Sequence, residues 1–318
     1  MTRPKPYLPA LCAGFLLLAA ADVLCGGSGF SVAEGAVLWK LRVPRVLTAL
    51  CCGGALAVAG AGMQSLFRNP LADPHILGVS GGAGLGAAVA VVLLGTAWPA
   101  FTGVTMVIAA FAGATLVSLL LLAVSRRIAS GPSLLIFGVL LGFLLSALTS
   151  ILQYTAHEEG LKLFYSWMAG SFSGSRYADI ALMAGALLVG FLLLSRTRKG
   201  LDLLLFGDTY ATLAGADVPR IRRVILAACC LLTAAVTAFC GPVGFIGIIA
   251  PHIARRLTGT SAHRTVLPAA LLCGASLALL ADILSQLAGL PAGSTVALLG
   301  LPLLLPLLLS RSGVQQGN

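Results

Sequence analysis

Long apolar runs that are almost free of charge constrain the fold of this chain more than any other feature of its sequence. Each run is continuous and about 16 to 25 residues long, which suits a helix that crosses a hydrocarbon core. Only 9% of the 318 residues are charged and 58% are hydrophobic, whereas soluble domains carry about 25% charged residues. Because lipid offers no water to the backbone polar groups, the spans must be helical.

The sequence predicts an all-α polytopic membrane protein with ten spans in a single transmembrane domain that covers residues 1–318. The eighth run holds only about 13 residues between Pro242 and Arg255, which is about 20 Å of helix, and it contains Pro251. We therefore expect a broken or partial helix there. The predicted helices cover residues 8–25, 46–67, 76–97, 101–125, 133–155, 179–195, 224–240, 243–257, 265–288 and 294–310, with ends good to a few residues.

The basic residues lie at the ends of the runs, so the net charge of +10 reports topology. Nucleic-acid binding would need a solvated basic face or a known motif, and neither is present. An N-terminus in the cytoplasm satisfies the positive-inside rule and puts both termini inside. The outer basic residues are then Lys40, Arg42, Arg45, Lys162 and Arg176. The inner ones are Arg3, Lys5, Arg68, Arg126, Arg127, Arg196, Arg198, Lys199, Arg220, Arg222, Arg223, Arg255, Arg256, Arg264 and Arg311.

The first run follows a basic start, Arg3 and Lys5, which is also the pattern of a cleaved signal peptide. The residues just before Cys25 lack the small residue that a processing site requires. Since further spans follow, we expect an uncleaved first helix.

Glycines recur every few residues from Gly53 to Gly86, across two runs joined by the polar hinge RNPLADP at residues 68–74. In water each glycine would weaken a helix by roughly 1 kcal/mol. In lipid, small residues let neighbouring backbones approach closely. This pattern predicts tightly packed helices around a functional turn.

The longest inner connection, residues 196–223, is interrupted by Gly200, Gly207, Gly215 and Pro219. Its middle is too short and too amphipathic to cross the membrane, and it predicts two short helices that meet near Gly207. We call this apolar-faced, two-helix part of the connection the knob. Spacing alone leaves two interpretations open, an interfacial helix resting on lipid or a docking surface for a partner.

A faint internal repeat is visible in the tripeptide Pro-His-Ile, which occurs at residues 74–76 and again at residues 251–253, five spans later. An odd offset would place the two copies in opposite orientations, as in transporters with inverted repeats.

Catalytic and metal-binding patterns are missing from the sequence. It contains no GxxxxGK[ST], HExxH or GxSxG motif, so the chain has no nucleotide-hydrolysing cradle and is not expected to be an enzyme. We expect no metal and no cofactor. The four histidines, His75, His157, His252 and His263, are scattered. The eight cysteines lie within or at the ends of apolar runs and are expected to be buried packing residues.

Few charges are predicted inside the membrane, and Asp282 is the notable one. It lies toward the outer end of its helix, so we favour a structural hydrogen bond to a neighbouring backbone over a transport role. An ion-coupled carrier would need several such groups, so energy should come from another subunit. The outer pair Arg42 and Arg45 either snorkels to the interface or docks an acidic partner.

Six blocks in order resemble the FecCD-type permeases, the membrane subunits of ABC importers for iron siderophores, haem and cobalamin. The blocks are LRVPR, GAGMQSLFRNPLADPHILGVSGGAG, FGDTYATLAGADV, GPVGFIGIIAPHIARRLTG, AHRTVLPAALLCGA and ALLAD. The resemblance implies a ten-helix subunit of a bacterial inner membrane, paired with a second permease copy or a paralogue. It also implies two ATP-binding subunits and an extracytoplasmic substrate-binding protein, and no nucleic acid.

The resemblance also implies roles for individual residues. Arg42 and Arg45 would receive acidic side chains of the binding protein. The fifth and tenth helices would line the pathway between the two permease copies. The cytoplasmic gate would include Asn69, Leu71, Ser130, Gly131, Pro132 and Ser133. The residues that seat in the ATPase would be Gly207, Asp208, Ala211 and Gly215.

Two positions depart from many relatives. Gln286 stands where an arginine would complete the outer basic patch, and Gly289 stands where an acidic residue is common. Docking would then rest on Arg42 and Arg45 alone or on a binding protein with other charges. We expect an importer of an iron-siderophore-type chelate, with haem or cobalamin as alternatives and a stand-alone secondary transporter as the rival.

Overall fold

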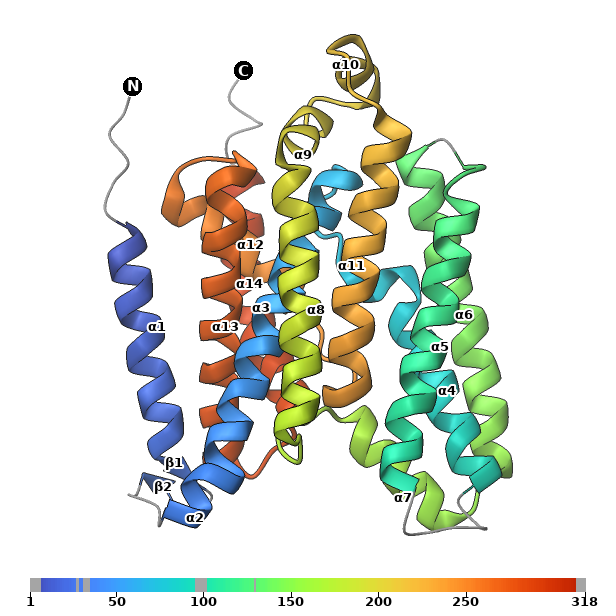
Figure 1. Ribbon diagram of the computed structural model, residues 1–318, viewed down its shortest axis with the longest axis vertical. Helices are drawn as coiled ribbons and strands as arrows, with labels where there is room; N and C mark the ends of the chain where they lie inside the picture. The colour runs from blue at the N-terminus through green and yellow to red at the C-terminus, as the bar shows by residue number, and fades with distance from the viewer. Residues whose placement is uncertain (1–6, 27–28, 31–34, 95–101, 129, 313–318) are drawn as a thin grey trace.

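The computed structural model describes residues 7–26, 29–30, 35–94, 102–128 and 130–312. Ten of its helices fall on the ten predicted spans (Figure 1), which confirms the all-α membrane fold. These are α1 (Tyr7–Leu24), α3 (Val43–Leu66), α4 (Val79–Leu94), α5 (Thr102–Val124), α6 (Gly131–Thr155), α8 (Tyr177–Arg196), α11 (Val218–Cys240), α12 (Ile246–Thr258), α13 (His263–Ala288) and α14 (Ala292–Ser312).

The remaining elements are short. A π-helical segment, η1 (Leu38–Arg42), leads from α2 (Gly35–Val37) into α3, and a two-stranded antiparallel pair, β1 (Cys25–Gly26) and β2 (Gly29–Phe30), follows α1. The other four are η2 (Pro74–Leu77), α7 (Glu158–Met168), α9 (Arg198–Leu204) and α10 (Asp208–Leu213).

Six helical segments in the described part of the chain are long and apolar enough to cross a membrane, and α1, α4 and α14 contain shorter apolar stretches. Helix α12 has 13 residues and contains Pro251, so the prediction of a partial helix is confirmed. At 1.5 Å per residue it spans about 20 Å. Its backbone is covered by protein, since Ile246, Ile249 and Ala250 are all fully buried.

Close backbone contacts confirm the tight packing predicted for the glycine-rich stretch. A Cβ added to Gly53 would overlap the carbonyl oxygen of Gly274, so α3 and α13 touch backbone to backbone. A Cβ added to Gly60 would likewise overlap the carbonyl oxygen of Gly247 in α12. One added to Gly82 of α4 would overlap the neighbouring helix α5. From Val46 to Leu66, α3 is almost entirely buried. It is therefore a central helix, packed against α8, α11, α12 and α13.

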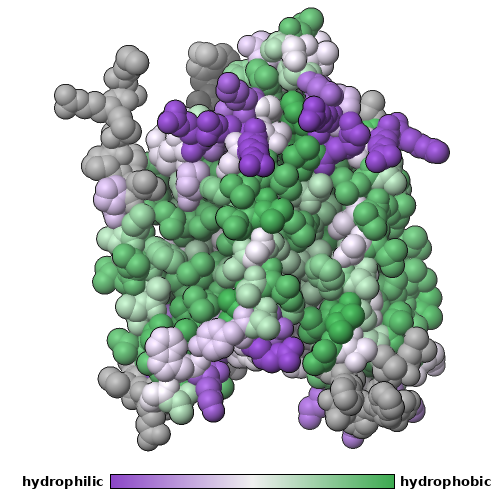
Figure 2. All heavy atoms as spheres, in the orientation of Figure 1, coloured by the Kyte–Doolittle hydropathy of each residue, from purple (hydrophilic) through white to green (hydrophobic). Residues whose placement is uncertain are grey.

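The two ends of the bundle differ. Helices α9 and α10 project from one end, which we call the knob end, and the first turn of α1 and the last turn of α14 lie at that end too (Figure 1). Figure 2 shows hydrophilic side chains gathered there, above a broad hydrophobic belt. We call the other end, with α2, α7 and the β1–β2 pair, the far end.

The amphipathic helix α7 was not predicted. It buries Phe164 and Trp167 between the ends of the spans and exposes Glu158 and Glu159. At 11 residues it is too short to cross the membrane and too polar to stand out as an apolar run.

The eight cysteines form no disulfide, and all except Cys12 are buried, so the prediction that they are packing residues is confirmed for seven. The two Pro-His-Ile copies differ in conformation, because the first lies in the 3-10 helix η2 and the second inside α12. The inverted repeat therefore stays a prediction.

Candidate functional site

A basic pocket of about 620 Å³ opens at the far end of the bundle. Its walls come from η1, the start of α3, the start of α8 and the end of α13. Four of its lining residues are cationic: Lys40, Arg42, Arg45 and Arg176. The predicted outer pair thus lies in one pocket with two further positive side chains.

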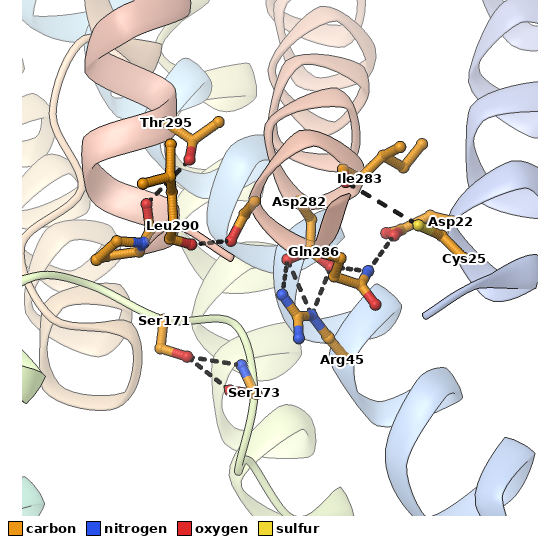
Figure 3. A network of polar contacts seen from close by, with 12 residues as sticks. Asp22, Cys25, Arg45, Ser171, Ser173, Asp282, Ile283, Gln286, Leu290 and Thr295 are labelled. Carbon is orange, nitrogen blue, oxygen red and sulfur yellow. Dashed lines mark hydrogen bonds and ion pairs between the residues drawn. The ribbon is translucent and has the colours of Figure 1, made fainter. Parts of the chain in front are cut away.

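Arg45 makes a two-pronged ion pair inside this pocket with Asp282 of α13 (Figure 3). Arg45 Nε lies 2.9 and 2.8 Å from the two carboxylate oxygens, and Nη2 lies 2.7 Å from Oδ1. The Asp282 side chain is 0% exposed and that of Arg45 is 24% exposed. The prediction that Asp282 bonds a neighbouring backbone is therefore wrong, because its partner is a guanidinium 237 positions away.

Gln286, one turn beyond Asp282, occupies the position of the missing arginine. Its amide donates to Asp22 of α1 at 2.9 Å and to Asp282 at 3.1 Å (Figure 3). The neutral amide of Gln286 thus donates hydrogen bonds to two buried carboxylates, at a position where an arginine would add a positive charge. The other departure, Gly289, ends α13 with a φ of +65°.

Arg42 is held at the end of α1, where its guanidinium donates to the carbonyl oxygens of Val23 and Leu24 at 3.2 and 3.0 Å. These are among the last carbonyls of a helix, which favour a cation. Lys40 and Arg176 are the exposed cations of the pocket. The docking role of Arg42 and Arg45 stays a prediction, and the structure adds that each also anchors a helix.

The hinge after α3 is a compact turn. Asn69 Oδ1 accepts the backbone N–H of Leu71 at 2.9 Å, and Asp73 caps η2 by accepting the N–H of His75 at 2.8 Å. The Leu71 side chain is exposed. Arg68 has a φ of +50°, a rare conformation for a residue with a side chain.

The second predicted gate segment begins α6. Ser130 is its N-cap and accepts the Ser133 N–H at 3.1 Å, with Pro132 in the first turn. A Cβ on Gly131 would lie 3.4 Å from the carbonyl oxygen of Leu66 at the end of α3. The structure therefore brings the start of α6 against the helix that leads into the hinge, while the gating role of both segments stays a prediction.

The knob consists of two short helices, α9 and α10, that meet at Gly207, as predicted. Gly207 has φ +108° and ψ +161°, a conformation that is essentially restricted to glycine. A Cβ there would lie 3.1 Å from the Arg68 guanidinium, so the hinge and the knob are neighbours. Gly215, with φ +82°, ends the segment.

The knob is attached to the bundle at one side and open at the other. Asp208 forms an ion pair with Arg222 of α11 at 2.8 Å, and Ala211 is fully buried. On the open side Phe206 is 72% and Leu213 is 84% exposed. Exposed apolar side chains rimmed by charge are typical of a protein interaction surface.

A chain of polar contacts, which the sequence analysis did not predict, runs from the partly exposed Asp202 to two buried side chains and joins the knob to two spans. Asp202 of α9 accepts from the backbone N–H of His263 at 2.9 Å and lies 2.6 Å from its Nδ1. His263 Nε2 lies 2.7 Å from Ser65 Oγ on α3. The order Asp, His, Ser resembles a hydrolase triad, but Ser65 is 1% exposed and can meet no substrate. These three contacts are structural. In the sequence, the only signal for them is the position of His263 at the start of a predicted helix.

Among the described residues, no group of three or more His, Cys, Asp or Glu side chains could hold a metal ion.

Comparison with known proteins identifies a protein family whose model matches this chain. The model of the FecCD transport family matches residues 7–310. The vitamin B12 import system permease protein BtuC of Escherichia coli O127:H6 is 39% identical over 306 residues, which cover 95% of this chain and 90% of that protein. BtuC of Shigella sonnei is 38% identical with the same coverage.

Two solved structures are similar in fold. An ABC transporter assigned to the metal-chelate type, in an inward-facing conformation, has a TM-score of 0.86 and 29% identity and covers 96% of this chain and 99% of its own. PsaBC from Streptococcus pneumoniae in complex with Fab has a TM-score of 0.53 and 16% identity over 84% of this chain and 90% of its own. The second shows a shared fold only.

Proposed function

The chain belongs to the FecCD transport family, and from this premise we propose that it forms the membrane pathway of an ABC importer that brings cobalamin into a bacterial cell. The family match covers residues 7–310. The chain is thus an ABC importer permease of the inner membrane, a transport protein rather than an enzyme. We treat residues 1–318 as one permease domain.

The proposed cargo differs from the one expected from the sequence. The resemblance put an iron-siderophore-type chelate first, with haem and cobalamin as alternatives. The observation that supports cobalamin as the cargo is the 39% identity, over 95% of this chain, with a permease named for vitamin B12 import. Cobalamin is itself a metal chelate, which agrees with the type of the similar transporter structure.

The family implies ATPase subunits and a permease partner, and the structure has suitable surfaces for both. The exposed apolar side chains of the knob, Phe206 and Leu213, suit a protein groove. Helix α6 exposes Ile136, Leu140 and Phe143 along one face. In our proposal, two ATP-binding subunits grip the knob, and a second copy or a paralogue covers part of α6 and α14.

We place the knob end in the cytoplasm. Helix α8 ends at Arg196, α9 begins at Arg198 and Arg223 lies near the start of α11, so these arginines belong to the knob end, as the positive-inside rule requires. Since α1 starts and α14 ends at the knob end, both termini are cytoplasmic in this orientation. The basic pocket of the far end then faces the extracytoplasmic binding protein.

Transport follows an alternating-access cycle driven from outside the chain. ATP binding closes the ATPase subunits, the knob moves with them, and the neighbouring hinge and α6 start change the cytoplasmic gate. Asp202 and His263 connect α9 to α13, and Arg68 adjoins Gly207, so the knob is linked to the bundle at two points. Hydrolysis reverses the bias and releases the cargo inward.

The cargo is tested by reconstituting the permease in liposomes with its ATPase and its binding protein. Uptake of cobalamin is compared with that of haem and a panel of ferric siderophores. We expect ATP-dependent accumulation of cobalamin alone. Accumulation of a siderophore without cobalamin would overturn the cargo and keep the permease. Accumulation by the permease alone, without ATPase or ATP, would instead establish the rival secondary transporter.

A further inference from the structure

A second basic pocket lies at the knob end, separate from the hinge and from the exposed face of the knob. Its volume is about 530 Å³. Three arginines line it, and one carboxylate, that of Asp208, faces them. The lining residues are Ser125, Arg126, Asp208, Thr212, Val218, Pro219, Arg222 and Arg223.

The charge balance of this pocket favours an anion. Asp208 is already bound to Arg222 at 2.8 Å, so that pair is close to neutral. Arg126 and Arg223 remain, and both are exposed. Within the described part of the chain, neither of them takes part in an ion pair. The net excess is two positive charges, with the hydroxyls of Ser125 and Thr212 beside them.

The position of the pocket decides which anion can reach it. One membrane-spanning helix, α5, ends at Val124 immediately before the pocket, and another, α11, begins at Val218 within it. The ends of two spans mark the depth of the lipid headgroups. Leu116, Leu119 and Leu120 of α5 are exposed on the membrane side of Arg126. At 1.5 Å per residue, Leu119 lies about 10 Å below Arg126, within reach of an acyl chain.

We propose that this pocket binds the phosphate of an anionic phospholipid whose acyl chains lie along the exposed leucines of α5. Basic pockets between transmembrane helices on the cytoplasmic side suit such headgroups. Because Asp208 and Thr212 belong to α10, the bound phosphate also holds the knob against the start of α11. The proposal uses the cytoplasmic orientation of the knob end but does not depend on the identity of the cargo.

The test is a lipid titration of the purified permease followed by native mass spectrometry, with phosphatidylglycerol compared with zwitterionic phosphatidylcholine. We expect phosphatidylglycerol to bind at least about tenfold more tightly. In Arg126→Gln/Arg223→Gln this preference should disappear. The matched control, Arg196→Gln/Arg198→Gln, removes two exposed arginines of the same end outside the pocket and should keep it. Arg126→Lys/Arg223→Lys retains the charges and should keep most of it.

A second measurement follows α10 itself. In nanodiscs with phosphatidylglycerol, hydrogen exchange of residues 208–213 should be slower than in phosphatidylcholine alone, in the wild type and not in Arg126→Gln/Arg223→Gln. Equal loss of lipid preference in the control pair would show a diffuse surface charge and overturn the site. Equal protection by inorganic phosphate in phosphatidylcholine nanodiscs would overturn the lipid as its source. Neither measurement requires cargo, so the result of the transport assay does not affect them.

Discussion

Among the described residues, each end of the bundle contains one arginine–aspartate pair with a buried member, and these two pairs are arranged in opposite ways. At the far end the carboxylate of Asp282 is 0% exposed and its partner Arg45 is 24% exposed. At the knob end the guanidinium of Arg222 is 5% exposed and its partner Asp208 is 36% exposed. The far end therefore presents positive charge at its surface, whereas at the knob end the carboxylate lies among the arginines of the second basic pocket and the open side of the knob presents apolar side chains.

In our proposal this difference suits two kinds of docking surface. In each pair the buried member fixes a helix, and the exposed member of the far-end pair adds to the positive charge of its pocket. A binding protein that docks at the far end would then bring acidic groups, whereas an ATPase that seats the knob would bring an apolar groove.

The largest expected effect comes from breaking the far-end pair. Asp282→Asn leaves the Arg45 guanidinium without its buried counter-charge, and loss of one partner of a buried pair costs about 3–5 kcal/mol. We expect much less folded protein after heating in detergent. The same substitution in the exposed pair Arg176–Asp179, Asp179→Asn, should cost at most about 1 kcal/mol.

A double variant sharpens this prediction. Arg45→Met/Asp282→Leu removes both charges and should recover much of the lost stability, since apolar side chains replace buried pairs well. If the double variant is as unstable as Asp282→Asn, the ion pair is not what joins α3 to α13.

Gly207→Val tests the knob side of the comparison. Valine cannot adopt the backbone conformation of Gly207 without about 1–3 kcal/mol of strain, and its side chain would press on Arg68. We expect normal insertion and ATP hydrolysis but at least about tenfold less uptake per ATP, measured in proteoliposomes. Gly174→Val, at φ +88° with open space around it, imposes similar strain at the far end and should leave coupling intact.

Reversing charge at the far end comes next in size. Arg42→Glu/Arg45→Glu also breaks the Arg45–Asp282 pair, so its docking is measured on the folded fraction. There we expect binding of the binding protein to be about tenfold weaker, with a loss that shrinks as salt rises because exposed charges are screened. Surface plasmon resonance at several salt concentrations measures this. Lys162→Glu, an exposed cation outside the pocket, is the control. Unchanged docking of the double variant would leave only the anchoring roles of Arg42 and Arg45.

The smallest effect is expected from Asp202→Asn. The amide still accepts the backbone N–H of His263 but loses the charge on the bond to Nδ1, a change of about 1 kcal/mol. We expect a small drop in thermal stability and faster hydrogen exchange in α9. An unchanged exchange rate would show that Asp202 does not hold the knob to α13.

Much of the architecture could be predicted from the sequence. The spans follow from apolar runs, and the two-helix knob follows from Gly207 and Gly215 within an amphipathic stretch. The short α12 follows from Pro251 in a run of limited length. Helix α7 could not be predicted in this way, because its two buried aromatic residues are too few to stand out from a loop.

The site was predictable only in part. Arg42, Arg45, Asp208 and Gly207 were identified from motif blocks, yet their partners were not. Sequence reasoning gave Asp282 a backbone partner, although its charge is met by Arg45. It also treated His263 as one scattered histidine among four.

By itself the sequence determined the membrane-spanning class and the helix order, because hydrophobic length and backbone preferences are local properties. Only the tertiary structure decided which charges meet. Arg45 reaches Asp282 because Gly53 and Gly274 let α3 and α13 lie backbone to backbone. Arg126 joins Arg223 in one pocket because the end of α5 lies beside the start of α11. Such contacts depend on the packing of segments far apart in the chain, which no local pattern records.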